Sequence, residues 1–213
     1  AQCLLPLIVL PALQAAKELF PNCKIILRRP ISKGFFCCMD KGNGLMLTSE
    51  DVDAISLKMR EIVDMDIPFR RHEAQVSEAI KMFKKLGQED KVKLLETCGE
   101  VYINYYTLDD TTDYYYDALV PSTGYLKVWS LSTYHGGMLL RVPDRHEPLK
   151  LAPFYEQPKT FDVFTETVNW NRIMGLSNVG DVNEACLNGR ASELIQVAEA
   201  LQEKKIVQIA EEI

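Results

Sequence analysis

A short turn carries the most distinctive set of chemically useful side chains in this sequence. In Leu119-Val-Pro-Ser-Thr-Gly-Tyr-Leu-Lys127, a proline and a glycine flank Ser122 and Thr123. Such a turn can present hydroxyls and backbone N–H groups to a ligand. The same composition is typical of a plain connection between two strands. Composition alone favours the plain turn, and both interpretations stay open.

The spacing of histidine and cysteine does not predict a metal centre. No two of the histidines, His72, His135 and His146, have the short spacing that places both on one metal. The cysteines form no C-x-x-C pair, so we expect reduced thiols of a cytosolic protein. Their positions are Cys3, Cys23, Cys37, Cys38, Cys98 and Cys186. Neither a P-loop nor a G-x-G-x-x-G loop occurs, so we expect no catalytic residue, metal or other cofactor in this chain.

Aromatic and basic side chains give only weak indications of nucleic-acid binding. Tyrosines gather between residues 102 and 116 and could stack bases. If the segment forms strands, half of them must face a core, so we expect packing there. The lysines between residues 81 and 93 are interleaved with Glu78, Glu89 and Asp90, as on a solvated helix face. With 24 basic and 30 acidic residues, the net charge of −6 argues against extensive phosphate binding.

The elements that must position these groups indicate an α+β fold. We expect strands near 24–28, 34–39, 101–107, 113–117, 125–131 and 138–142, with turns at 42–44 and 135–137. Helices are expected near 11–20, 49–66, 77–86, 89–97, 158–174, 181–188 and 192–213. Strands in the middle with helices on both sides predict an antiparallel sheet packed with helices, followed by a C-terminal helical segment.

Two features of the sequence bear on its organisation. The apolar start lacks a basic region and is too short and proline-broken to span a bilayer, so we expect a loop and then a buried helix with Pro11 in its first turn. No membrane partner is therefore expected. The stretch 143–158 is rich in proline and charge, which predicts a domain over 1–142 and a helical segment over 143–213. Because Met is absent from position 1, we expect the chain to be a piece of a longer protein.

Several motifs together resemble the editing region of threonyl-tRNA synthetases and, more loosely, of alanyl-tRNA synthetases. The resemblance covers roughly residues 10–142 and implies the α+β fold of that region, the second additional domain. It is carried by Ala16-Lys-Glu-Leu-Phe-Pro21, Gly34-Phe-Phe36, Leu47-Thr-Ser-Glu-Asp-Val52, Met59-Arg-Glu-Ile62, Leu86-Gly-Gln-Glu-Asp-Lys-Val-Lys-Leu94 and Val120-Pro-Ser-Thr-Gly-Tyr-Leu-Lys127.

The C-terminal third resembles a different family. Its motifs are similar to the segment that joins a synthetase-type region to a P-loop kinase domain in bacterial uridine-kinase-like nucleoside kinases. They are Leu139-Leu-Arg-Val-Pro143, Glu156-Gln-Pro-Lys159, Gly175-Leu-Ser-Asn-Val-Gly-Asp-Val182 and Val197-Ala-Glu-Ala-Leu-Gln-Glu-Lys-Lys205. This resemblance implies a cytoplasmic parent protein whose kinase domain, the partner of this module, lies beyond Ile213. That domain would use ATP and Mg²⁺.

The resemblance to synthetases fails at the residues that carry editing chemistry. The H-x-x-x-H pair of that family falls on Leu10 and Gln14, and its C-x-x-x-H pair falls on Tyr115 and Leu119. Hydrolysis of mischarged tRNA is therefore expected to be lost, and tRNA is not expected as a partner. We expect the module to bind, regulate or dock. The alternatives are a tRNA deacylase acting in trans and a pure interaction module.

If the cleft persists, its lining predicts a nucleoside-like ligand. A flat, partly apolar ring could stack on a tyrosine, while hydroxyls and a lysine fix its orientation. The candidate pocket residues are Gln14, Tyr115, Ser122, Thr123, Tyr125 and Lys127. The alternative is that neighbouring side chains collapse into the space, which close packing favours.

Overall fold

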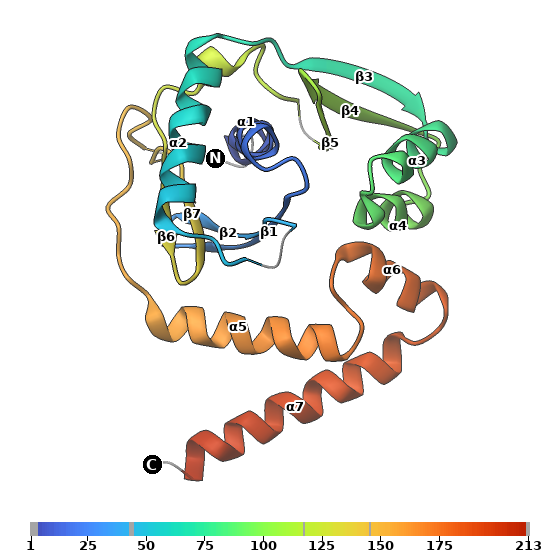
Figure 1. The fold of residues 1–213 in the computed structure, drawn as a ribbon. Coiled ribbons are helices and arrows are strands. Elements are labelled where there is room, and N and C mark those ends of the chain that lie inside the picture. The colour runs from blue at the N-terminus through green and yellow to red at the C-terminus, as the bar shows by residue number, and fades with distance from the viewer. Residues whose placement is uncertain (1–3, 43–44, 117, 145, 212–213) are drawn as a thin grey trace. The chain divides into compact units, whose positions relative to one another are not determined.

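The computed structural model describes residues 4–42, 45–116, 118–144 and 146–211. It divides the chain into two compact units. The first comprises Ala1–Glu73 and Asn104–Phe164, and the second comprises Ala74–Ile103 and Thr165–Ile213. The domain boundary expected after residue 142 stays a prediction. The expected α+β class is confirmed, since antiparallel sheets pack with helices and the C-terminal segment is helical (Figure 1).

The first unit is built on a four-stranded antiparallel sheet with the order β1-β2-β7-β6 (Figure 1). Its strands are β1 (Lys24–Ile31), β2 (Gly34–Asp40), β6 (Ser130–Tyr134) and β7 (Gly137–Arg141). On one face, Cys37, Leu131 and Leu140 join the core formed with helices α1 (Leu4–Leu19) and α2 (Ser49–Asp64). On the other face, Tyr134 and Leu139 pack with Phe161 of helix α5 (Pro158–Ile173). The alternation of side chains along each strand thus produces two apolar layers.

Strand β1 occupies one edge of this sheet. Its pairing with β2 is regular from Lys24 to Leu27, and the register then shifts before Pro30. Ile26 and Leu27 remain 46% and 36% exposed. At the opposite end of the sheet, β6 and β7 form a hairpin whose turn residues, His135 and Gly136, both have positive φ. The turn expected at residues 135–137 is confirmed, whereas most of the turn expected at 42–44 lies outside the described residues.

Helix α1 begins earlier than expected, so the prediction of a loop before Pro11 is wrong. The helix runs from Leu4 and contains Pro11 in its interior. A proline there removes one backbone hydrogen bond and costs roughly 3 kcal/mol. Leu7, Ile8 and Leu10 are 0–2% exposed. Burial of three such side chains contributes roughly 1.5–3 kcal/mol each, which offsets the proline.

A three-stranded sheet, ordered β3-β4-β5, contains a strand that the sequence pattern does not reveal. Strand β3 (Arg70–Gln75) is polar except for Ala74 and pairs with β4 (Tyr102–Leu108). His72 is held by a 3.0 Å hydrogen bond with the Thr107 hydroxyl. Strand β5 (Thr111–Tyr114) starts before the expected residue 113 and ends at Tyr114, so the strand expected up to Asp117 is wrong at Tyr115 and Tyr116, and Asp117 lies outside the described residues.

The strand expected over 125–131 is corrected by the structure. Thr123–Tyr125 form one turn of 3₁₀ helix, residues 126–129 belong to no strand, and β6 begins only at Ser130. Leu126 and Trp129 are nevertheless 6% and 7% exposed. The apolar pattern here reflects burial of single side chains around a turn, and it is not caused by strand pairing.

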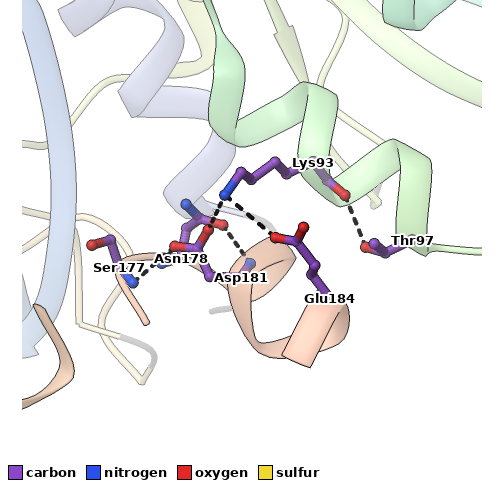
Figure 2. Close-up of polar contacts among 6 residues, drawn as sticks. All are labelled: Lys93, Thr97, Ser177, Asn178, Asp181 and Glu184. Carbon is purple, nitrogen blue, oxygen red and sulfur yellow. Dashed lines mark hydrogen bonds and ion pairs between the residues drawn. The ribbon is translucent and has the colours of Figure 1, made fainter. Parts of the chain in front are cut away.

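The second unit contains α3 (Val76–Lys85), α4 (Glu89–Thr97), α6 (Val179–Leu187) and α7 (Ala191–Glu211). Figure 2 shows how α6 attaches to α4. Asn178 caps α6, since its side chain accepts from the backbone N–H of Asp181 at 3.0 Å. The Asp181 carboxylate accepts in turn from the backbone N–H groups of Ser177 and Asn178 at 2.9 and 3.1 Å. Its second oxygen lies 2.7 Å from the Lys93 ammonium nitrogen.

Gly180 sits where α6 approaches the backbone of α4. A Cβ added there would lie 2.7 Å from Lys93 Cβ and 2.8 Å from the backbone nitrogen of Leu94. Partial burial raises the pKa of the Asp181 carboxyl, but Lys93 and the two N–H donors more than offset this, so the pKa lies below its usual value. The motif Ser177-Asn-Val-Gly-Asp181 therefore joins two helices by a cap, an ion pair and a close contact.

Helices α5 and α7 bury no residue in the part of the chain that the structure describes. Their apolar side chains, such as Ile173, Ile195 and Ile206, are 80%, 58% and 58% exposed. Within the described ranges, no helix has both the length and the apolar character needed to cross a membrane. Cys23, Cys37, Cys38, Cys98 and Cys186 are free thiols, and Cys3 lies outside the described residues.

Candidate functional site

The four positions that correspond to the editing residues lie in or against the core of the first unit. Leu10 is fully buried in α1, and Gln14, one turn later, is 5% exposed. Tyr115 and Leu119 follow β5 and pack against the same core. Whether the cleft that the resemblance implies is open or filled stays a prediction. Among the described residues, no three His, Cys, Asp or Glu side chains gather where they could hold a metal.

Gln14 has a structural environment that uses both ends of its amide. Its Nε2 donates to Glu18 Oε1 at 2.8 Å, and its Oε1 accepts from the Thr111 hydroxyl at 2.5 Å. Glu18 continues the chain of contacts to Lys58 of α2, at 2.9 Å. The side chain thus links α1 to β5 and α2. A buried polar group that is hydrogen-bonded at both its nitrogen and its oxygen stabilises the fold.

Tyr115 contributes a phenol to the same core. Its hydroxyl oxygen is buried and meets no hydrogen-bond partner among the described residues. Burial raises the pKa of Tyr115 well above its usual value, and the nearby Asp113 carboxylate raises it further. The phenol therefore stays protonated at neutral pH. It has neither the thiolate nor the imidazole character needed for transition-metal binding or nucleophilic chemistry.

The Pro121–Thr123 segment is hydrogen-bonded to the chain that follows α2. The Thr123 side chain is fully buried, and its hydroxyl donates to the Ile62 carbonyl at 2.8 Å and accepts from the Ile67 N–H at 2.9 Å. The backbone N–H of Thr123 donates to the Ile67 carbonyl, and that of Phe69 donates to the Pro121 carbonyl, each at 2.9 Å. These contacts fix the turn to the end of α2, whatever its role in ligand binding.

Asp66 completes this connection. Its carboxylate accepts from the Ser122 hydroxyl and, at 3.0 Å, from the Gly124 N–H. These two hydrogen bonds, with Lys127 nearby, hold the pKa of Asp66 below its usual value. A Cβ at position 124 would lie 2.7 Å from Asp66 Cγ, so a side chain there would displace the Asp66 carboxylate from these contacts.

A concavity of about 560 Å³ opens beside the turn. Val63, Leu126 and Trp129, all at most 9% exposed, supply its apolar lining. Charged groups and an exposed tyrosine add polar lining. They are Arg60, Asp64, Asp66, Tyr125 and Lys127. The Arg60 guanidinium carbon lies 5.0 Å from the centroid of the Trp129 ring, a cation–π arrangement.

The contacts described above place the six predicted pocket residues in three groups. Gln14 and Tyr115 belong to the core, Ser122 and Thr123 belong to the connection with α2, and Tyr125 and Lys127 line the concavity. Tyr125 and Lys127 share the concavity with other polar groups, and ligand binding by all six residues stays a prediction.

The sequence analysis missed Arg60 and Trp129. For Arg60, the sequence offers one indication of a surface role, its position on the polar side of a strongly periodic helix, near the end of that helix. Trp129 is far from it in sequence, so their contact has no local signature.

Comparison with known proteins gives a partial similarity. No protein-family profile matches the chain. The threonine–tRNA ligase of Laribacter hongkongensis is 39% identical over 119 residues, which cover 55% of this chain and 18% of that protein. That of Geobacter sp. (strain M21) is 33% identical over 123 residues, which cover 58% of this chain and 19% of that protein.

The chain spans about a fifth of the length of these curated relatives. It is therefore similar to one region of threonine–tRNA ligases, over somewhat more than half of its own length. These matches do not test the resemblance of the C-terminal third to nucleoside kinases.

Proposed function

We propose that this chain is a non-catalytic module, derived from a synthetase editing region, that binds, regulates or docks within a cytoplasmic ATP-dependent nucleoside kinase of the uridine-kinase type. The observation that carries the first part is the replacement of all four editing positions. Leu10 and Leu119 have no donor atom, both ends of the Gln14 amide are engaged, and Tyr115 is a protonated phenol.

The kinase context rests on the C-terminal motifs. The Ser177–Asp181 segment, which resembles the kinase linker, forms the cap and ion pair that hold α6 on α4. A linker segment with a defined structure of its own could hold a neighbouring domain in a fixed orientation. In such a parent protein, the P-loop domain would bind ATP and Mg²⁺ and transfer the γ-phosphoryl group to a nucleoside hydroxyl.

The kinase context predicts a P-loop in the coding sequence after Ile213. Sequencing of the locus should reveal G-x-x-x-x-G-K-[ST] there, and the purified parent protein should phosphorylate nucleosides. The isolated chain should not, because it contains no phosphate-binding loop. Nucleoside-dependent ATP turnover by the isolated chain, abolished by a substitution within it, would refute this division of labour.

The second candidate function is deacylation of mischarged tRNA in trans, which the similarity to threonine–tRNA ligases favours. We expect no hydrolysis of mischarged threonine tRNA above the uncatalysed rate and well under one equivalent of zinc after purification without chelator. The positive control is the corresponding region of a threonine–tRNA ligase. Hydrolysis that is lost on Gln14→Ala or Tyr115→Phe would show that the editing alignment is wrong and would favour the deacylase.

A further inference from the structure

The concavity between the end of α2 and the Gly124–Trp129 segment combines features of a small-molecule site. Its volume of about 560 Å³ falls within the roughly 300–1,000 Å³ typical of ligand pockets. Val63, Leu126 and Trp129 supply apolar lining. Removal of a flat, partly apolar ring from water against such a lining is favourable. Tyr125 is 63% exposed and leaves an aromatic ring accessible beside it.

The cations in the lining are available for a ligand. Among the described residues, neither Arg60 nor Lys127 forms an ion pair. Arg60 is oriented by its contact with Trp129 at 5.0 Å, so part of the entropy of placing its donors is already lost. Asp66 lies near Lys127, but its Oδ1 is engaged by Ser122 and Gly124.

The balance of charge selects the kind of ligand. Two cations and two carboxylates, Asp64 and Asp66, line the hollow, so its formal charge is zero. A phosphate dianion would meet two carboxylates as well as two cations. A neutral ring with carbonyl acceptors and hydroxyl donors would satisfy both sets, since guanidinium and ammonium groups donate and Asp64 accepts.

We propose that this concavity is a nucleoside-binding site distinct from the former editing cleft. The base lies on the apolar surface beside Trp129 and Tyr125, its carbonyl oxygens accept from Arg60 and Lys127, and the sugar hydroxyls donate to Asp64. This assignment deepens the proposed function and rests on it only for the choice of nucleosides as probes.

The test uses the intrinsic fluorescence of Trp129. The chain has two tryptophans, so Trp170→Phe leaves Trp129 as the single reporter. Titration of this variant with uridine should give a saturable change in emission, and uridine 5′-monophosphate should bind more weakly. Lys127→Met and Arg60→Met should each weaken uridine binding about tenfold or more, because each removes a charged donor. Lys24→Met, the same change at an exposed lysine outside the concavity, is the matched control.

Three results would overturn the assignment. One is the absence of a saturable change up to about 10 mM uridine, cytidine or adenosine. A specific site of this kind should have a dissociation constant well below that concentration. Another is tighter binding of the monophosphate, which would make the site one for anions. The third is equal affinity of Lys127→Met and Lys24→Met. Circular dichroism of each variant separates lost binding from lost folding. A negative titration would leave the predicted P-loop and the predicted absence of deacylation standing, so the two proposals fail separately.

Discussion

Gly180→Val is expected to detach α6 from α4 and to destabilise the second unit by roughly 3 kcal/mol or more. The added Cβ would fall 2.7–2.9 Å from Lys93 and from the backbone of Leu94. Backbone atoms inside a helix cannot move aside as a flexible side chain can, so the two helices must separate. That separation would also lengthen the 2.7 Å contact between Lys93 and Asp181 (Figure 2).

Denaturant unfolding and amide hydrogen exchange would measure this effect. Amides of α4 and α6 should lose protection together, while those of α1 and α2 in the other unit keep it. Ala198→Val, which introduces the same side chain at an exposed helical position, should cost only a few tenths of a kcal/mol and is the matched control. Equal stability of the two variants would show that α6 does not approach α4 as closely as the structure has it.

Thr123→Val is expected to destabilise the first unit by about 3 kcal/mol, although threonine and valine have nearly the same shape. The change removes the hydroxyl that donates to the Ile62 carbonyl and accepts from the Ile67 N–H. Each buried backbone group left without a partner costs about 1–3 kcal/mol. Thr123→Ser keeps the hydroxyl and loses one methyl group, which costs about 0.8 kcal/mol.

Urea denaturation followed by the emission of Trp129 would compare these two variants in the Trp170→Phe background, since Trp129 lies six residues after the substituted position. A valine variant as stable as the serine variant would contradict the structural role of the hydroxyl. The contrast also separates this role from ligand binding, because stability is measured without any added nucleoside.

The elements that the sequence predicts well are those whose ends depend on neighbouring residues. Helix α2 begins at Ser49 because Thr48 and Asp51 form a reciprocal cap, a pattern visible in four consecutive residues. Helix α4 likewise occupies Glu89–Thr97, as expected. Strand β3 was missed because Arg70–Gln75 has no apolar alternation and depends on its partner strand.

The candidate site likewise depends on contacts between residues far apart in the sequence, which local patterns do not predict. The turn around Ser122 and Thr123 is evident from proline and glycine, but its tie to Asp66 joins residues 56 positions apart. No local pattern encodes that distance. The hydroxyls of Ser122 and Thr123, which the sequence offers to a ligand, form hydrogen bonds within the fold. The hollow beside them is completed by Arg60, whose environment depends on tertiary packing.

The irregular edge of the first sheet has a consequence for solubility. An edge strand leaves backbone N–H and C=O groups that another chain can pair with, and exposed Ile26 and Leu27 would favour such stacking. The register shift between Leu27 and Pro30 interrupts the flat ladder that an incoming strand needs. Pro30 offers no N–H, and Arg28 and Arg29 add like charges that repel a second copy. The same register shift in β1 therefore works against edge-to-edge aggregation of this module at high concentration.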